Sequence, residues 1–498
     1  MKRLPSVMCI AVLLVFFLSL PGHSAENGGD TDELSVTGRT ERCLGCHRNA
    51  TPGIVEDWYA GLHSRTTPQM ALQKDKLERR MSAEQVNENL LNNVVGCYEC
   101  HGLNVDQHKD SFNHFGLKIN VVVSPRDCST CHPVEAKEYI PSKKGFAYGN
   151  LKENPVYHGL VKTIISVKKT QDGKVVPQEA SAFTEMDTCF GCHGTDVKVN
   201  GLKKVSAGPL KITVPDLTNW PNQGVGRLNP DGSRGCCSSC HPRHSFSIDI
   251  ARKPYTCAQC HLEPDVPAWN VYKESKHANI YSSKEKYWEF NTVPWVLGKD
   301  FMAPTCATCH NSLVTTPKNK VIAERTHDFG ARLWVRIFGL IYSHPQPKTG
   351  DTYVIKNKDG LPLPTDFTGN WAADYLIDER EQESRKQAMT NVCNACHSTS
   401  WVDGHFAKLD STIKETDQMV LGATLLLTDA WGKNLADNQN PFDETIEHLW
   451  AAQWLFYANS IRYASAMTGA PDYATFKNGW WDMTRNLKVM EDWITMHQ

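Results

Sequence analysis

The sequence carries little net charge, because 53 lysines and arginines nearly balance 55 aspartates and glutamates. The formal net charge of -2 excludes a basic nucleic-acid-binding protein and a highly charged disordered chain. No apolar run of membrane-spanning length occurs after residue 20. With a hydrophobic content of 40%, these absences predict a water-soluble globular protein of 498 residues.

The single long apolar run lies at the N-terminus, from Val7 to Leu20, and follows the basic residues Lys2 and Arg3. A small-residue segment ending at Ala25 comes next, and this order is typical of a secretory signal peptide. We expect the signal to be removed and the mature chain to be exported to the periplasm or an equivalent extracytoplasmic compartment. A retained anchor helix is the alternative.

Cysteine is abundant, with 18 residues beside 20 histidines. Sixteen of these cysteines form eight copies of the pattern Cys-x-x-Cys-His. The copies are Cys43, Cys46 and His47; Cys97, Cys100 and His101; Cys128, Cys131 and His132; Cys189, Cys192 and His193; Cys237, Cys240 and His241; Cys257, Cys260 and His261; Cys306, Cys309 and His310; and Cys393, Cys396 and His397. In this pattern the two thiols bind the vinyl groups of a haem and the histidine binds its iron. The sequence therefore predicts eight covalently attached haem c groups.

Zinc binding is the main alternative for paired cysteines. Zinc sites do not require a histidine directly after each second cysteine, whereas all eight copies have one. Two cysteines lie outside the pattern. Cys9 belongs to the signal, and Cys236 either begins a longer attachment motif in place of Cys237 or is a buried, unreactive thiol.

Histidines outside the motifs could bind the opposite faces of the haems. Eleven remain after the signal is set aside: His63, His108, His114, His158, His244, His277, His327, His344, His405, His448 and His497. The number permits eight haems with two histidine ligands each, or seven such haems and one with an open position. The first case describes an electron conduit and the second an enzyme, because only an iron with a free position can bind substrate.

Strand periodicity is weak over most of the chain, and we expect a mainly α multihaem cytochrome c with little β structure. Short helical turns and loops separate the motifs between Glu41 and His405. The segment from Ile164 to Val176 is the one candidate hairpin, with turn residues Gln171-Asp172-Gly173.

Beyond His405 the pattern becomes helical. Apolar and aromatic residues recur mostly at intervals of three and four at Ile446, Leu449, Trp450, Trp454, Tyr457, Ile461 and Ala464. Further helices are expected over 412–435 and from about Asn478 to the C-terminus. We therefore divide the chain into a signal peptide (1–25), an octahaem-binding domain (26–411) and a C-terminal module of long helices (412–498) that packs against other subunits.

The motif order, the segments 235–247 and 272–277, and the helical C-terminal region resemble the hydroxylamine oxidoreductase and hydrazine dehydrogenase family of octahaem cytochromes c. The resemblance covers nearly the whole mature chain. It implies seven conducting haems with two histidine ligands each, and a catalytic haem held by Cys189 and Cys192 with His193 as its axial ligand. The distal ligands that it implies are His63, His114, His158, His244, His277, His327 and a seventh that is His405 or, as second choice, His448.

Two further positions are implied by the resemblance. Oxidative members cross-link the catalytic haem to a tyrosine of the adjacent subunit in a covalent trimer, and Tyr473 is the similar position here. The alternative for Tyr473 is packing alone. Family members also place an Asp-His pair beside the catalytic iron, and here Asp265 is present whereas Val266 replaces the histidine. Asp265 would accept or donate protons if its surroundings raise its pKa.

From these residues we favour a homotrimeric enzyme that oxidises hydroxylamine to nitric oxide or nitrite. Electrons would leave through the other haems to a partner such as a small cytochrome c. The first alternative is a reductive family member that acts on nitrite or nitric oxide without the tyrosine cross-link. The second is a multihaem electron conduit without catalysis.

Overall fold

The computed structural model describes residues 34–469 and 471–498. The expected signal peptide and Cys9 lie outside these residues. Helix accounts for 47% and strand for 13% of the structure, which confirms the mainly α fold class. No helix among the described residues is both long enough and apolar enough to cross a membrane.

Short helices joined by long loops build the part of the chain that contains the motifs. Up to the fourth motif they are α1 (Gly38–Ala50), α2 (Pro52–Ala60), η1 (Leu62–Ser64), α3 (Pro68–Leu72), α4 (Glu88–Leu91), α5 (Cys97–His101), α6 (Pro125–Cys128), α7 (Pro133–Tyr139), α8 (Ala147–Lys152), α9 (Pro155–Ile165), α10 (Ala182–Asp187) and α11 (Cys189–His193). They continue as η2 (Cys237–Ser239), α12 (Ile248–Arg252), α13 (Pro254–Ala258), α14 (Ala268–Lys273), α15 (Lys276–Lys284), η3 (Glu285–Tyr287), α16 (Cys306–His310), η4 (Thr352–Val354), η5 (Ala373–Tyr375) and α17 (Glu379–Asn394).

Within residues 34–469 and 471–498, the strands form small, separate sheets. Four antiparallel pairs are β1 (Ser111–His114) with β2 (Leu117–Asn120), β3 (Val167–Gln171) with β4 (Lys174–Gln178), β5 (Lys198–Ala207) with β6 (Leu210–Thr218), and β10 (Val335–Arg336) with β11 (His344–Pro345). The remaining sheet contains β7 (Trp295–Val296), β8 (Val314–Thr315) and β9 (Val321–Ala323). The expected hairpin is confirmed as β3 and β4, with positive φ angles at Asp172 and Gly173; Gln171, expected in the turn, is the last residue of β3.

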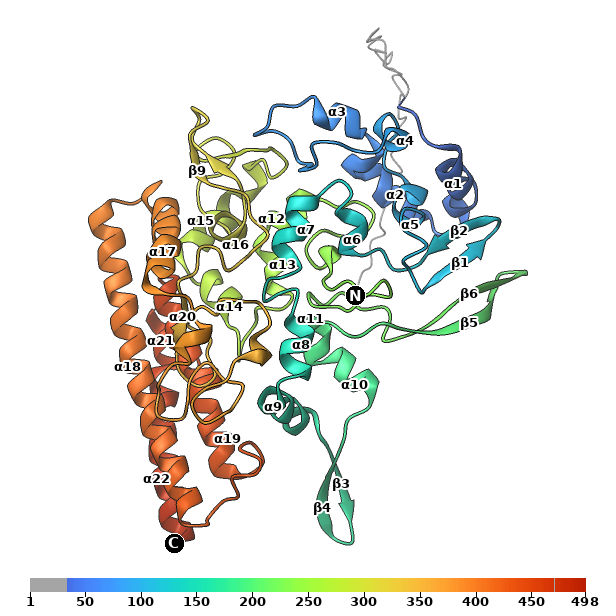
Figure 1. The fold of residues 1–498 in the computed structure, drawn as a ribbon. Coiled ribbons are helices and arrows are strands. Elements are labelled where there is room, and N and C mark those ends of the chain that lie inside the picture. The colour runs from blue at the N-terminus through green and yellow to red at the C-terminus, as the bar shows by residue number, and fades with distance from the viewer. Residues whose placement is uncertain (1–33, 470) are drawn as a thin grey trace, which may run out of the picture.

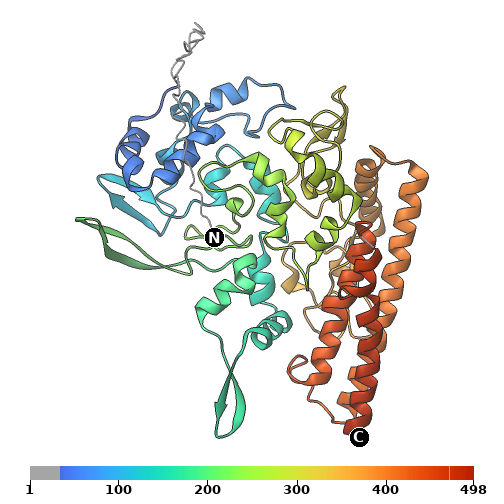
Figure 2. The ribbon, with the colours of Figure 1, turned by 180° about the vertical axis from the view of Figure 1, so that it is seen from behind.

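The hairpin of β5 and β6 was not expected from the sequence. Its strands pair from Lys198 with Thr218 to Ala207 with Leu210, and a bulge follows Val199. Figure 1 shows this hairpin extending away from the body on the side opposite to the long C-terminal helices, whereas the β3–β4 hairpin extends downward from the body next to α9. Figure 2 shows the same arrangement from behind.

The C-terminal region is a bundle of long helices, as expected. It contains α18 (Thr399–Gly432), α19 (Thr445–Ala452), the π-helical turn η6 (Gln453–Ala458), α20 (Asn459–Ala466), α21 (Pro471–Phe476) and α22 (Trp480–His497). Helix α18 begins directly after the last motif, where the Ser398 side chain accepts a hydrogen bond from Trp401 N, and it continues through position 412.

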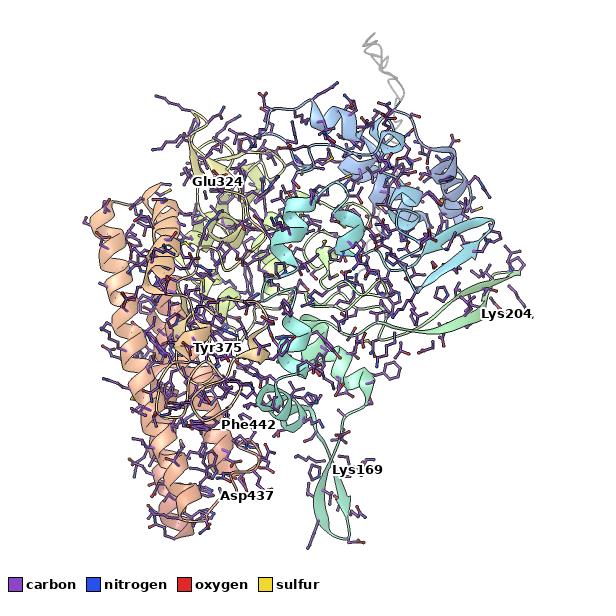
Figure 3. All side chains as sticks on the ribbon, viewed as in Figure 1. Lys169, Lys204, Glu324, Tyr375, Asp437 and Phe442 are labelled. Carbon is purple, nitrogen blue, oxygen red and sulfur yellow. The ribbon has the colours of Figure 1, made fainter. Side chains whose placement is uncertain are left out.

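A hydrophobic core holds the C-terminal helices together. Ile446, Trp450, Trp454 and Ile461 are all buried in it, as their spacing predicted, and Phe442 closes the end near the loop before α19 (Figure 3). Apolar packing of this kind stabilises the bundle without any cofactor. The motif-bearing part has smaller clusters of buried side chains.

Candidate functional site

Each attachment motif includes a helical turn. The first, second, fourth and seventh motifs lie entirely in α1, α5, α11 and α16. The third, fifth, sixth and eighth overlap α6, η2, α13 and α17 at their first residues. On such a turn the two cysteines are three positions apart and project from the same side. The histidine that follows is then placed beside them, which is the geometry that covalent haem attachment requires.

Residues of seven motifs line one large cavity of about 1470 Å³. Its lining runs from Cys100 of the second motif to His397 of the eighth and is mainly apolar, whereas the first motif lies outside it, beside β1. A connected, largely apolar space bordered by cysteine pairs and histidines fits several haem groups held close together. The motif-bearing part therefore has a cavity where an ordinary domain has a core.

The motif histidines have the protonation state that iron binding needs. Burial lowers the pKa of His261 to about 3 and that of His310 to about 4, so both imidazoles are neutral near pH 7. Backbone carbonyls orient other rings: His101 Nδ1 lies 2.8 Å from Asn120 O and His193 Nδ1 lies 3.3 Å from Ala147 O. Such a bond uses Nδ1 and leaves Nε2 for a metal.

Three predicted distal histidines face a motif histidine at a spacing that matches an iron between them. The ring centroids are 6.3 Å apart for His114 and His47, 6.4 Å for His63 and His132, and 6.1 Å for His277 and His397. Two imidazole nitrogens, each about 2 Å from one metal ion, place their ring centroids about 6 Å apart. These pairs therefore fit bis-histidine haems at the first, third and eighth motifs.

Two further predicted distal histidines lie near a motif histidine. The charge of His101 lowers the pKa of His244, and that of His241 lowers the pKa of His327, in each case after the larger effect of burial. His244 has a φ of +69°. With these two neighbours, five of the eight motif histidines have a nearby candidate for the opposite haem face.

The other predicted distal ligands are placed differently. His405 lines the cavity, stacks on Trp401 and lies 3.1 Å, through Nε2, from Ala466 O. His448, the second choice for the seventh ligand, is exposed on α19. Of the two choices, His405 is therefore the one that lies at the cavity. His158 is on α9, where its charged neighbours are lysines and glutamates rather than a motif histidine.

His108, a spare histidine without an assigned role, belongs to a buried ionic network. Its Nδ1 lies 3.2 Å from Asp110, and its Nε2 lies 3.2 Å from Asp127 and 4.0 Å from Asp231. Burial lowers the pKa of His108, but hydrogen bonds to Asp110 and Asp127 outweigh burial and raise it to about 9. This imidazolium links the loops before the third and fifth motifs and is not an iron ligand.

Close contacts between cysteines of different motifs give the spatial order of the attachment sites. A hydrogen bond from the Cys97 thiol lowers the pKa of Cys43 to about 7, and one from Cys260 does the same for Cys192. Equivalent pairs join Cys237 with Cys128 and Cys257 with Cys306. The first site therefore adjoins the second, the third adjoins the fifth, and the sixth adjoins both the fourth and the seventh.

The fourth motif lies against a tightly packed loop. Gly194, directly after His193, has a φ of +96°, and a side chain there would come within 2.3 Å of Arg227 N. Glycine is required because both the left-handed conformation and the close backbone exclude a Cβ atom. This packing holds the histidine of the fourth site in place.

Asp265 lies beside the fourth motif, as the sequence predicted. It lines the cavity, and its charge acts on Cys189, Cys192 and Tyr463. Asp265 is exposed at the edge of this cavity, and desolvation by the protein atoms around its carboxyl raises the pKa of that carboxyl. Asp265 therefore holds a proton to a higher pH than an ordinary aspartate.

A set of cations near the fourth motif was not found from the sequence. Arg336 and Lys144 line the cavity, and after burial their positive charges lower the pKa of His193. Strand pairing places Arg336 opposite His344, whose Nδ1 lies 2.7 Å from Pro345 O. Lys143 is also buried nearby, and burial followed by the charge of Arg336 lowers its pKa to about 7. No sequence pattern marks these residues, because isolated basic residues occur throughout the chain.

Tyr473 is buried within its own chain. It is 7% exposed, packs with Val271 and Ala464, and donates a hydrogen bond of 2.9 Å to Glu263 Oε2. Burial and the neighbouring carboxylate raise its pKa above the usual range. Cys236 is also buried, with its Sγ 3.2 Å from Ser238 Oγ, as expected of an unreactive thiol.

Comparisons with known proteins agree with the haem motifs. Residues 231–324 match the family model described as "Seven times multi-haem cytochrome CxxCH". A solved structure described as a hypothetical multiheme protein is 43% identical, with a TM-score of 0.88, and the match covers 93% of this chain and 96% of that one. Fold and site together therefore define a multihaem c-type cytochrome.

Two proteins from Kuenenia stuttgartiensis are also similar to this chain. A probable nitrite reductase-hydroxylamine oxidoreductase fusion protein is 27% identical over 411 residues, which are 80% of this chain and 39% of the relative. The reducing HAO-like (hydroxylamine oxidoreductase-like) protein complex shares the fold, with a TM-score of 0.60, 17% identity, and coverage of 92% of this chain and 85% of that one. The chain is thus a multihaem cytochrome that is similar to hydroxylamine oxidoreductase-like proteins, and it spans about two fifths of the fusion protein.

Proposed function

We propose that this protein carries eight haem c groups and acts as an oxidoreductase on a small nitrogen compound at the fourth site, held by Cys189, Cys192 and His193. Among the described residues, five motif histidines have a spare histidine nearby, and His193, His261 and His310 do not. Two predicted distal ligands, His158 and His405, remain for these three, so one site stays open.

The substrate that the site favours is nitrite or a related anionic nitrogen oxide, which the enzyme would reduce. The observation that carries this proposal is a pair of cations, Arg336 and Lys144, that line the cavity near His193 and are here called the cationic wall. The charges of Arg336 and Asp265 also both act on Tyr463, which lines the same cavity. Cations in an enclosed, weakly polar cavity attract anions strongly, and a guanidinium can bind two oxygens of one anion. Hydroxylamine is not an anion near pH 7 and would gain less from this wall.

Residues of this chain also serve the proton chemistry. When bound, a haem at the fourth site supplies an iron with one free coordination position and exchanges single electrons. Arg336 would orient the anion. Asp265, whose pKa is raised by burial, would hold a proton within the same cavity and donate it to the bound nitrogen oxide.

Oxidation of hydroxylamine, favoured by sequence reasoning, is the second candidate. Tyr473 supports it, because the resemblance gives a tyrosine at this position to the oxidative members. The curated relative is itself named as a probable fusion of a nitrite reductase and a hydroxylamine oxidoreductase, which is compatible with either direction. Reduction is preferred here because Val266 replaces the histidine of the Asp-His pair and Tyr473 is bonded within its own chain.

The remaining parts of the proposal concern location and assembly. We infer export of the mature chain from the sequence of its first 25 residues. We also propose a homotrimer and electron exchange with a small cytochrome c. Haem propionates would make the body acidic, which favours a partner with a basic face.

A steady-state comparison of both directions tests the proposed reaction. The purified holoprotein would be assayed with nitrite and a reduced artificial donor, and separately with hydroxylamine and an artificial acceptor. We expect nitrite-dependent oxidation of the donor to have the larger kcat/KM. Faster turnover of hydroxylamine would support the oxidative candidate, and no turnover of either substrate would support an electron conduit.

A further inference from the structure

The β5–β6 hairpin has an apolar face that its own chain leaves exposed at the tip and half-buried at Val205, Ile212 and Val214. Register pairs Val205 with Ile212, Ala207 with Leu210, and Lys203 with Val214, so these side chains share one face of the ribbon. Leu210 at the tip is 55% exposed, and Ala207 is exposed as well. Two-stranded ribbons are at most marginally stable alone in water, so an extended one with an apolar face gains stability from a partner surface.

The two extended hairpins are also basic. Residues 167–178 and 198–218 together contain seven lysines and two aspartates. Figure 3 shows Lys169 and Lys204 on the hairpins, away from the body. Lys203 pairs with Asp216 at 2.8 Å, whereas no ion pair forms for Lys204 or Lys211 within residues 34–469 and 471–498. The hairpins therefore have positive charge available for an acidic surface.

A surface of matching character lies on the C-terminal helices of the same chain. Residues 378–498 contain 17 acidic and ten basic residues. On α22, Trp481, Val489 and Met496 are 59%, 42% and 75% exposed. Their spacing of eight and seven residues places them along one side of the helix. The basic residues between them are neutralised, since Arg485 pairs with Asp482, and Lys488 pairs with Glu491 and Asp492.

The β5–β6 hairpin and the C-terminal helices lie on opposite sides of the molecule, as Figures 1 and 2 both show. The hairpin of one chain therefore cannot cover α22 of its own chain, but it can cover that helix in another copy. A contact between two different surfaces of identical chains repeats head to tail, and it closes into a ring when the rotation permits. The basic, partly apolar hairpin thus complements the acidic C-terminal module and the exposed apolar side of α22, which favours a second copy of this chain as its partner.

We propose that the β5–β6 hairpin is an arm that docks its apolar face, which includes Leu210 and Ile212, on the outer side of α22 in the next copy of this chain. Lysines of the arm attract the acidic helical module of that copy. The proposal specifies the contact surfaces of the inferred oligomer and is independent of the direction of the redox reaction.

The mass of the haem-loaded protein in solution tests the proposal. By light scattering after gel filtration, the wild type should be a multiple of the single chain. Leu210→Ser with Ile212→Ser, and separately Trp481→Ser with Met496→Ser, should shift the protein to single chains at micromolar concentration. Phe183→Ser is the matched control, because Phe183 is 75% exposed on α10, outside both surfaces, and should leave the mass unchanged.

Charge reversal provides a second test. Lys204→Glu with Lys211→Glu should weaken assembly at least tenfold, whereas Lys318→Glu with Lys320→Glu, on the exposed β8–β9 turn, should not. Haem content and the optical spectrum, measured beside each mass, report whether the body is intact. A single-chain wild type, or arm variants that assemble like the wild type, would overturn the proposal.

Cross-linking of the wild type gives an answer that does not depend on how variants fold. Copies labelled with ¹⁵N and unlabelled copies would be mixed, allowed to exchange and treated with a carbodiimide, which joins lysines to carboxylates in contact. We expect mixed-isotope peptides that link the hairpin lysines to carboxylates of residues 378–498. Links only within one chain, or only to another protein, would contradict docking on a second copy.

Discussion

Tyr473 donates its hydroxyl hydrogen bond to Glu263 of the same chain, with 2.9 Å between the two oxygens. Glu263 is two residues before Asp265, so this bond holds α21 against the segment that borders the fourth haem site. The same hydroxyl cannot bond a neighbouring chain's haem while it is held here. The resemblance gives oxidative members a tyrosine cross-link at this position, so the state of Tyr473 bears on the direction of the proposed reaction.

We predict that the protein gives a single-chain band on a haem-stained denaturing gel after boiling with reductant. Tyr473→Phe should give the same band and the same optical spectrum for the fourth haem, because the variant loses only the bond to Glu263. A covalent trimer that Tyr473→Phe abolishes would instead establish the cross-link and favour oxidation of hydroxylamine.

Replacement of Arg336 should separate binding of anionic and neutral substrates. For Arg336→Gln we expect the KM for nitrite to rise by about tenfold or more, because a charge-assisted hydrogen bond contributes about 1.5–3 kcal/mol. Hydroxylamine kinetics should change much less, and Arg336→Lys should recover part of the nitrite affinity. Arg380→Gln, an exposed position on α17, is the control. An unchanged KM for nitrite in Arg336→Gln would contradict the proposal that Arg336 binds the anionic substrate.

Asp265 should control the pH dependence of nitrite reduction. Burial raises its pKa, so the carboxyl stays protonated to a higher pH than usual, and turnover should fall as pH rises through that value. Asp265→Asn keeps the shape but loses the proton, and we expect kcat to fall roughly 100-fold and this alkaline limb to disappear. Asp265→Glu should retain the limb. Profiles of kcat against pH for the wild type, Asp265→Asn and Asp265→Glu test this prediction. An unaltered alkaline limb in Asp265→Asn would show that another group causes the fall in turnover.

His108 should make the protein less stable in alkali. Its pKa is about 9 in the folded chain and about 6.5 when unfolded, so the stabilisation is complete below about pH 6.5 and is lost as pH rises through about 9. Replacement by glutamine leaves Asp110 and Asp127 without their cation and should cost on the order of 3 kcal/mol at pH 7. Thermal melts at pH 7 and pH 10 measure this. Equal melting temperatures of both proteins at pH 7 would contradict the ionic network.

The parts of the fold that sequence reasoning predicted are those set by short-range spacing. Motifs on helical turns follow from covalent geometry, and the C-terminal helices follow from apolar residues at intervals of three and four. Helix α18 nevertheless begins at Thr399, well before the expected start at position 412, because Ser398 caps it at the end of the last motif. The β5–β6 hairpin was not predicted, because Gly201 and the adjacent lysines Lys203 and Lys204 interrupt the alternation of apolar and polar residues in its first strand.

The site was predictable only where the chemistry leaves a repeated pattern. His63, His114 and His277 were found by resemblance, and the ring spacings now support them. Arg336 could not be found, since its role comes from a two-residue strand that pairs it with His344. His158 remains a prediction, because its neighbours are charged side chains rather than a motif histidine.

The most direct test of the central claim is a titration of the oxidised protein with nitrite, followed by electron paramagnetic resonance and optical absorption. The account predicts one high-spin iron among eight per chain, which nitrite converts to a new species, while seven low-spin irons stay unchanged. His193→Ala should remove the nitrite-sensitive signal alone. Eight low-spin irons that do not respond to nitrite would contradict an open site and leave an electron conduit.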